Sequence, residues 1–384
     1  MRITAAIHVP VALAMTGGAR LLGLDDAGLV GTALALVLFG LFPSRARRLF
    51  PDRPRSRWEL HLVDEPYFAH FSAALGAAIP IALVSVLVPL VQLLGGRTIA
   101  FPFEATFFVY LFFLAVAAWG VFIRRRWVEE REIEVPIAGL PEAFDGYRIA
   151  HLSDLHVGGF TPRRVFEKWF ARANAKKPDL VAVTGDMVTS GTAFHEDIAE
   201  VIGQLETKDG VIVAMGNHDY FGEGEPLVGL LRDKGAYVLR NEGLVIERNG
   251  QRLLIAGVDD NWSRRDNLEK ALRLRDAEDT TVLLAHDPVM FEEARRAGVE
   301  LTLSGHTHGG QVAMPFFAKK LSLAQLTHKH FLGLYREGES AVYVNAGLGT
   351  TGPPLRLGVP PEIAVLVLRA APRHPKEARL ASAG

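Results

Sequence analysis

The sequence predicts an α/β domain built on mixed β-sheets and preceded by an α-helical transmembrane region. Residues 1–127 contain several long apolar runs, whereas from about residue 132 short β-rich runs alternate with amphipathic helical segments. Strands that alternate with helices indicate a layered α/β architecture, and hairpins among them indicate mixed sheets. The mean hydropathy of +0.17 is high for a purely soluble chain.

The two parts of the chain also differ in charge. Residues 1–127 hold 12 Arg, no Lys and 7 acidic residues and so carry +5, while the remainder holds 30 basic and 36 acidic residues and carries −6. An acidic second part argues against a nucleic-acid partner, because nucleic-acid binders present a basic face. The chain has no Cys, which excludes disulfides and thiolate metal ligands.

The N-terminal part contains candidate membrane spans, and we expect it to form a membrane domain with about four transmembrane helices over residues 1–127. The first candidate is the weakest, because Gly17, Gly18 and Arg20 interrupt it. A signal peptide is the alternative there, although no small-residue cleavage site follows cleanly. The last candidate is the clearest, because it is rich in Phe and ends in an Arg and Trp anchor at 124–127. The candidates are residues 3–24, 27–43, 71–96 and 105–123.

Arginine placement predicts how the membrane domain is oriented. The loop after the second candidate span is rich in arginine, and the fourth span ends in three more. The other two connections carry Asp25 and Asp26, and Arg97 with Glu104. The positive-inside rule then predicts a multi-pass protein of the cell (inner) membrane, with the 44–70 loop and everything after residue 124 in the cytoplasm. The loop arginines are Arg45, Arg47, Arg48, Arg53, Arg55 and Arg57.

The second part divides into a linker with a first strand (128–145), a catalytic domain (146–370) and a tail (371–384) that we expect to be disordered. Thr161-Pro162 is expected to be the N-cap and first residue of a helix to about Lys177. Asn249-Gly250 predicts a hairpin, because this pair favours a tight turn between two strands. The expected strands are 133–135, 148–152, 180–184, 210–215, 244–248, 252–258, 281–285, 301–304, 341–345 and 363–368.

Polar side chains follow five of these strands at the point where each strand ends. Ligands of α/β sheets bind outside the carboxyl ends of the strands, so these side chains are expected to form one site. Each alone has a simpler interpretation as a helix cap, a turn residue or a core histidine, but five at consecutive strand ends favour a shared function. Carboxylates and imidazoles without thiolates suit Mn, Fe or Zn in a hydrolytic site. The residues are Asp154, His156, Asp186, Asn217, His218, Asp219, His286, His306 and His308.

As an ordered set, these residues closely resemble the motifs of the calcineurin-like metallophosphoesterase superfamily. The motifs are Asp154-x-His156, Gly185-Asp186, Gly216-Asn217-His218-Asp219, His286 and Gly305-His306-x-His308, within residues 132–368. The Gly309-Gly310-Gln311 extension and the stretches 347–350 and 354–356 are similar to the bacterial membrane-anchored phosphoesterases. The resemblance implies a metallophosphoesterase sandwich of two mixed β-sheets flanked by helices.

The resemblance also implies a site with two divalent metal ions, Mn, Fe or Zn. It assigns Asp154, His156 and His308 to the first metal, Asn217, His286 and His306 to the second, and Asp186 to a bridge between them. His218 would be a catalytic residue that stabilises charged oxygens or protonates the leaving group, and Asp219 would orient it.

The expected function is that of a membrane-anchored phosphoesterase that hydrolyses a phosphodiester or pyrophosphate bond by attack of a metal-bridging hydroxide. The expected partners are a phosphorylated small molecule or lipid, with lipid-linked and nucleotide compounds as candidates, and the bilayer. Met187-Val188-Thr189 stands where some protein phosphatases carry Asp and Arg, which disfavours a phosphoprotein substrate. The apolar and basic stretch 314–335 is either a substrate cap or a packed excursion.

Two alternatives belong to other classes of protein. One is an inactive phosphoesterase domain with a membrane scaffold or transport role, against which the complete ligand set argues. The other is a nuclease of the same superfamily, against which the acidic balance of the domain argues.

Overall fold

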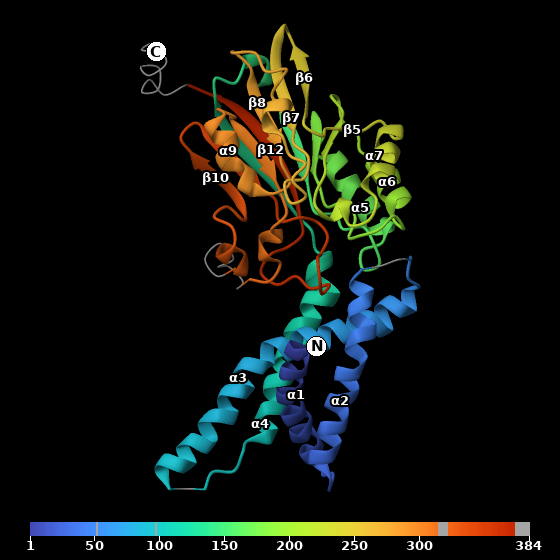
Figure 1. The fold of residues 1–384 in the computed structure, drawn as a ribbon, viewed down its shortest axis with the longest axis vertical. Helices are drawn as coiled ribbons and strands as arrows, with labels where there is room; N and C mark the ends of the chain where they lie inside the picture. Colours follow the sequence, from blue (N-terminus) through green and yellow to red (C-terminus); the bar gives the residue numbers. More distant parts are fainter. Residues whose placement is uncertain (51–52, 97, 314–321, 373–384) are drawn as a thin grey trace. The chain divides into compact units, whose positions relative to one another are not determined.

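The computed structural model describes residues 1–50, 53–96, 98–313 and 322–372, and the chain forms two compact units. The helical unit comprises Met1–Phe50 and Arg55–Arg124 with Gly352–Leu355, and the α/β unit comprises most of the remainder (Figure 1). The predictions for Arg97, for most of the tail and for residues 314–321 of the apolar and basic stretch lie outside the described residues.

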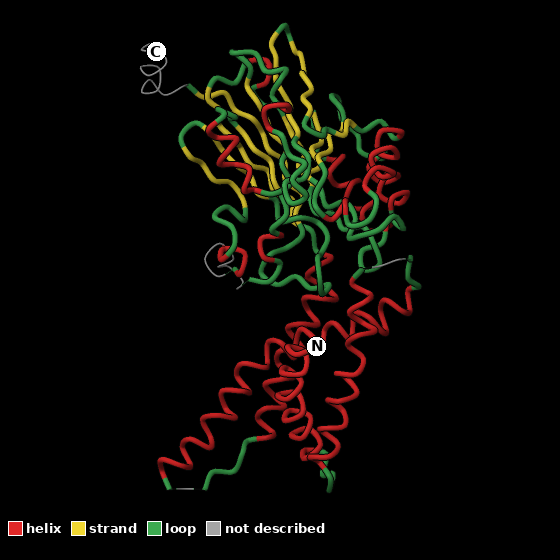
Figure 2. The backbone as a smooth tube through the Cα atoms, viewed as in Figure 1, coloured by secondary structure: helices red, strands yellow, loops and turns green. Residues whose placement is uncertain are grey.

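The helical unit consists of four long helices (Figure 2). Within the described residues, three helical stretches are long and apolar enough to cross a membrane: Ala27–Leu49, Glu59–Gly95 and Phe103–Arg126. The first predicted span is also helical, but it is not among these three stretches. The helices are α1 (Arg2–Leu21), α2 (Ala27–Ala46), α3 (Glu65–Gly95) and α4 (Phe103–Ala118), with η1 (Arg47–Leu49), the π-helices η2 (Glu59–Asp64) and η3 (Trp119–Ile123), and η4 (Arg124–Arg126).

Small residues let these helices approach one another closely. A Cβ on Gly31 of α2 would overlap Thr16 of α1, and one on Gly76 of α3 would overlap the Phe113 ring of α4. Close contact at small residues is the usual basis of helix association in membranes, where burial of apolar surface gives no advantage over lipid. The pairs α1–α2 and α3–α4 therefore pack closely because glycine leaves room for a side chain of the neighbouring helix.

Within its described residues, the α/β unit contains two six-stranded sheets, with strand orders β1-β12-β2-β3-β4-β5 and β10-β11-β9-β8-β7-β6. Both are mixed: β12 runs parallel to β1 and antiparallel to β2, and β11 runs parallel to β9 and antiparallel to β10. The predicted sandwich of two mixed sheets flanked by helices is therefore confirmed. The strands are β1 (Glu129–Ala138), β2 (Arg148–Leu152), β3 (Leu180–Thr184), β4 (Val211–Ala214), β5 (Tyr237–Val238), β6 (Glu242–Arg248), β7 (Gln251–Gly257), β8 (Thr280–Leu284), β9 (Leu301–Ser304), β10 (Gly333–Glu337), β11 (Ser340–Val344) and β12 (Glu362–Ala371).

Each central strand is buried on both faces, and this explains its continuous apolar sequence. In β3, Leu180 and Ala182 join the core between the two sheets, while Val181 and Val183 join the core beneath α5, α6 and α7. On the other sheet, Leu283 of β8 faces the core formed with α8 and α9. The helices are α5 (Arg163–Ala175), α6 (His195–Ile202), α7 (Gly224–Asp233), α8 (Leu268–Ala271) and α9 (Phe291–Arg296), with the short helices η5 (Glu142–Phe144), η6 (His218–Tyr220), η7 (Pro288–Met290), η8 (His308–Gly310) and η9 (Leu323–Leu326).

Local predictions differ from the structure at the start of α5, in the bounds of β1 and at two strands that were missed. Pro162, not Thr161, is the N-cap of α5, and its extended backbone (φ −73°, ψ 156°) places the first helical residue at Arg163. The Asn249-Gly250 hairpin is confirmed, since Arg248 pairs with Gln251. Strands β5 and β10 were not predicted, because β5 has two residues and the β10 sequence, GLYRE, shows weak alternation.

Candidate metal centre

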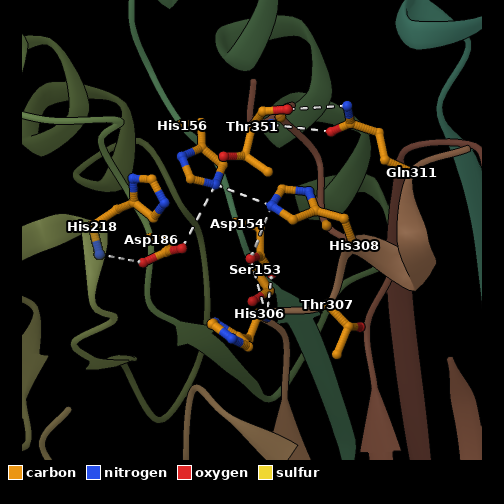
Figure 3. A network of polar contacts seen from close by, with 12 residues as sticks. Ser153, Asp154, His156, Asp186, His218, His306, Thr307, His308, Gln311 and Thr351 are labelled. Carbon is orange, nitrogen blue, oxygen red and sulfur yellow. Dashed lines mark hydrogen bonds and ion pairs between the residues drawn. The ribbon is translucent and has the colours of Figure 1, made fainter. Parts of the chain in front are cut away.

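The predicted site residues lie at the carboxyl ends of strands from both sheets. Figure 3 shows six of them together: Asp154, His156, Asp186, His218, His306 and His308. Strands β2, β3 and β4 are parallel neighbours in one sheet, and β8 and β9 are parallel neighbours in the other. Parallel neighbours end at one edge of a sheet, so the loops that follow them meet there. Asp154 and His156 follow β2, Asp186 follows β3, Asn217, His218 and Asp219 follow β4, His286 follows β8, and His306 and His308 follow β9.

The backbone of these loops is unusual, because several site residues have the left-handed conformation that favours glycine. Such conformations cost roughly 1–3 kcal/mol each and persist where the surrounding structure holds them, most often at functional sites. The residues, with their φ angles, are Asp154 (50°), His156 (45°), Asp186 (51°), His306 (67°) and His308 (50°).

Hydrogen bonds and close packing hold the loops in this conformation. The backbone N–H of Asp154 donates to Gly185 (3.0 Å), and that of His156 donates to Asp186 (2.9 Å). Both oxygens of the Asp154 carboxylate accept from the His306 N–H at 3.0 Å. A Cβ on Gly305 would overlap the Ser153 hydroxyl and the Asp154 carboxylate, so the loop after β9 needs glycine at this position.

Asp154, His156 and His308 form the first group of possible metal ligands. The Nε2 atoms of His156 and His308 are 3.1 Å apart, and His308 Nε2 lies 3.4 Å from Asp154 Oδ1. Ligand atoms ~2.1 Å from one cation lie about 3.0–3.4 Å apart, so these separations fit a shared cation. All three side chains are buried.

Asp186, His286 and His306 form the second group. His286 Nε2 lies 3.2 Å from Asp186 Oδ2 and 3.3 Å from His306 Nδ1. Asn217 Oδ1 is buried and finds no hydrogen-bond partner within the described chain, and a buried carbonyl oxygen in this situation suits a cation. Asp186 Oδ2 also lies 3.7 Å from His156 Nε2, so this carboxylate faces both groups. The residues present therefore fit divalent cations.

Burial sets the protonation of most of these imidazoles. It lowers the pKa of His156 to about 3 and that of His306 to about 4, and it lowers the pKa of His308 well below its ordinary value. At neutral pH these imidazoles are therefore neutral, which is the form that binds a metal. Burial also raises the pKa of the Asp154 carboxyl to about 6.

Asp186 and His286 form an ion pair within the site. Burial alone would lower the pKa of His286, but the charge and hydrogen bond of Asp186 raise it to about 10. Burial would likewise raise the pKa of Asp186, but the charge of His286 holds it below its usual range. A proton therefore resides on His286 at neutral pH, and a cation at this position would have to displace it.

The His218 imidazole is oriented by a backbone carbonyl. Its Nδ1 lies 2.7 Å from the Thr189 carbonyl oxygen, which can only accept, so Nδ1 carries the hydrogen. Asp219, for which the sequence suggested the orienting role, accepts instead from the backbone N–H groups of Met187, Val188 and Gly216. Asp219 thus ties the loop after β3 to the loop after β4.

Other residues of the site carried no assigned role in the sequence. The buried carboxylate of Asp287 lies 3.9 Å from His306 Nε2 and 3.6 Å from His328 Nε2. Asp287 and His328 therefore lie next to the second ligand group. The position of Asp287 directly after His286 is the signal that could have indicated it. The Arg356 guanidinium is fully buried, donates to the Gly347 and Gly349 carbonyls, and lies 3.3 Å from His308 Nδ1.

Gln311, the last residue of the Gly309-Gly310-Gln311 extension, is hydrogen-bonded to another loop. Its side-chain amide donates to the Thr351 carbonyl (3.1 Å) and accepts from the Thr351 N–H (3.0 Å) (Figure 3). This reciprocal pair connects the loop after His308 to the loop that follows β11.

Comparison with known proteins places this architecture in a family. The profile of the calcineurin-like phosphoesterase family matches residues 147–310. The chain is 31% identical to an uncharacterized metallophosphoesterase of Aquifex aeolicus over 237 residues (58% of this chain, 85% of that protein). It is 32% identical to a transmembrane protein with metallophosphoesterase domain of Danio rerio over 283 residues (70% of this chain). That match spans 64% of the Danio rerio protein, less than two thirds of its length.

Among solved structures, the Haemophilus influenzae NAD nucleotidase is similar at 16% identity and a TM-score of 0.36, covering 53% of this chain and 45% of that one. A likeness this distant carries no argument about function. The ligand groups at the strand ends, the match over 147–310 and the identity to the Aquifex aeolicus protein together show that the chain belongs to the calcineurin-like phosphoesterase family.

Proposed function

We propose that this protein is a membrane-anchored, metal-dependent phosphoesterase that hydrolyses a phosphodiester or pyrophosphate bond. The observation that carries the proposal is the position of Asp186, whose Oδ2 lies 3.7 Å from a ligand of the first group and 3.2 Å from a ligand of the second. One carboxylate between two ligand groups suits a pair of divalent cations that act on one phosphoryl group.

The ligand assignment follows the two groups. The first cation would be held by Asp154, His156 and His308. The second would be held by Asn217, His286 and His306, and Asp186 would bind both cations. When bound, the cations would supply Lewis-acid stabilisation of the phosphoryl oxygens and lower the pKa of water. The buried surroundings of the ligands strengthen such electrostatic interactions.

His218 is the residue placed to move a proton. With its hydrogen on Nδ1 and bonded to Thr189, the imidazole can present Nε2 to a substrate. Its ring packs edge-on against that of His156 at 4.8 Å, so it borders the first ligand group. In its protonated form, His218 would stabilise a phosphoryl oxygen or donate to the leaving alkoxide.

Membrane attachment is supported by the three apolar helices and by relatives that are named transmembrane proteins. The arginines that flank the second and fourth predicted spans favour a cytoplasmic catalytic domain. The candidate substrates are then phosphorylated small molecules or lipids that are accessible from the cytoplasm.

The test is hydrolysis of bis(p-nitrophenyl) phosphate by the purified full-length protein with Mn²⁺. We expect the native protein to hydrolyse this ester. We expect Asp186→Asn to lower the turnover rate roughly 100-fold and to lose at least one bound metal, because a neutral amide cannot balance two dications. Asp276→Asn is the matched control, since Asp276 is an exposed carboxylate that pairs with Arg252. Full metal content with normal turnover in Asp186→Asn would refute the two-metal assignment. A folded native protein without metal or turnover would favour the scaffold role.

A further inference from the structure

Two exposed aromatic rings lie against histidines of the candidate metal centre, one beside each ligand group. The Phe221 side chain is 45% exposed, and its ring centroid is 4.5 Å from that of His218. The Trp262 side chain is 63% exposed, and its ring centroid is 5.8 Å from that of His306. Because they lie beside the site, these two rings offer apolar surface to a ligand that binds there.

Both aromatic residues are held by ordered turns. The buried carboxylate of Asp260 accepts from the Trp262 N–H (3.1 Å) and from the N–H and hydroxyl of Ser263 (2.9 and 2.6 Å). The Phe221 N–H donates to the His218 carbonyl (3.0 Å), and the Phe221 carbonyl accepts from Gly191 (2.6 Å). A fixed backbone lowers the entropy lost when these side chains bind a ligand.

Two exposed aliphatic side chains also occur near the second ligand group. Val289 is 60% exposed and lines a cavity of about 440 Å³ together with His328. The His328 ring lies 5.5 Å from that of His306, so the cavity opens beside the second ligand group. Leu326, two residues before His328, is 77% exposed. The volume is within the range of small-molecule sites.

The cations of the cavity are already neutralised by carboxylates. Arg296 pairs with Glu292 at 2.9 Å, and Lys329 pairs with Glu337 at 2.6 Å. The cavity therefore offers little net charge for a second anionic group. Phe221, Trp262, Val289 and Leu326, which we call the apolar rim, are exposed apolar side chains near the centre and are available for recognition.

We propose that the substrate is an amphiphilic phosphoester, whose phosphoryl group binds at the metal centre and whose alkyl chain lies on the apolar rim. This inference rests on the proposed phosphoesterase function. Val289 and Leu326 contribute area without hydrogen-bonding groups, which favours an alkyl chain over a nucleobase, whose polar edge needs partners. A fully buried methylene strengthens binding roughly fourfold, so chain length gives a sensitive readout.

The experiment uses the full-length protein in lipid nanodiscs with Mn²⁺ and a series of p-nitrophenyl alkyl phosphates. Hydrolysis breaks the P–O bond to nitrophenolate and forms one to the oxygen of water, leaving an alkyl phosphate and a proton. The measured quantity is the ratio of kcat/KM for the decyl ester to that for the ethyl ester. Because each ratio is taken within one protein, it does not depend on the active fraction. Partitioning into the nanodisc affects native and variant proteins equally.

We expect the Phe221→Ala/Trp262→Ala double variant to lower this ratio about tenfold relative to the native protein. Trp262→Leu, which keeps an apolar side chain, should retain most of the ratio. Leu274→Ala removes an exposed hydrophobic side chain of another segment and should retain the native ratio.

An unchanged ratio in an active double variant, which includes an equal fold-loss for both esters, would overturn the proposal. A larger loss for p-nitrophenyl thymidine 5′-phosphate than for the decyl ester, in both Trp262→Ala and Trp262→Leu, would overturn it in favour of a nucleobase. If the native protein hydrolyses none of these esters, the proposed function itself fails, which is a separate result.

Discussion

The His218 imidazole is oriented by the protein backbone, through its 2.7 Å contact with the Thr189 carbonyl oxygen. We predict that His218→Asn keeps its bound metal but lowers kcat by roughly 100-fold or more, because general acid catalysis contributes on that order. The loss should be larger for alkyl than for nitrophenyl leaving groups, since poor leaving groups need the proton more. Steady-state kinetics with both groups and metal analysis check this. Equal losses would assign His218 to charge stabilisation instead.

His286 determines how the centre responds to pH. Its folded-state pKa of about 10 lies above its ordinary 6.5, so without metal the protonated His286 contributes stability that is fully present below pH 6.5 and is lost as pH rises through 10. The lowered pKa of Asp186 contributes stability that is lost in acid. Metal binding requires the neutral imidazole, so apparent metal affinity should increase as pH rises toward 10.

The corresponding measurement is calorimetric titration of the apo protein with Mn²⁺ at pH 7, in buffers of different ionisation enthalpy. We expect release of about one proton per protein, declining as pH approaches 10. Binding without proton release at pH 7 would contradict the assignment of this proton to His286.

Among the elements, the turn after β9 depends most closely on one glycine. We predict that Gly305→Ala destabilises the fold by about 1–3 kcal/mol and removes metal from the first group, because the added Cβ would displace Ser153 and Asp154. Thermal unfolding and metal analysis check this. The control is Gly229→Ala in α7, where a Cβ meets nothing within 4 Å and alanine favours the helix. Normal metal content in Gly305→Ala would show that the loop can relax.

Element prediction succeeded where a local pattern determines the structure. Asn249-Gly250 specifies the β6–β7 hairpin, and the apolar runs 180–184 and 301–304 coincide with β3 and β9. It failed for β10, which is a strand because it pairs with β11, Gly333 opposite Val344. A short edge strand depends on its partner more than on its own sequence.

For the whole molecule, we predict that the catalytic domain lies in the cytoplasm. A reporter fused after Ala371 should behave as cytoplasmic, because translocating the flanking arginine clusters is unfavourable. The native chain has no Cys, so single cysteines report position directly. Cysteines at Ser44 and Ser56 should resist an impermeant thiol reagent in intact cells, whereas one at Gly95 or Gly96 should react. The opposite labelling pattern would place the metal centre outside the cell.

In the helical unit, some of these arginines also have a structural role. Arg45, Arg48 and Arg55 lie 3.0–3.3 Å from the fully buried carboxylate of Asp64. The sequence indicated the arginine cluster as a topological signal but not its partner. A buried carboxylate needs such pairing, because an isolated buried charge is very costly.

The sequence by itself determined which residue types stand at the strand ends, because strand and turn patterns are local and the ordered Asp, Asn and His residues are specific to one family. Only the tertiary structure decided which of these side chains meet. Parallel pairing of β1 with β12, the contact of His156 with His308 and the neighbours of Asp219 and Asp287 join segments far apart in the chain. The physical reason is that such contacts depend on sheet order and loop conformation, which arise when the whole core packs.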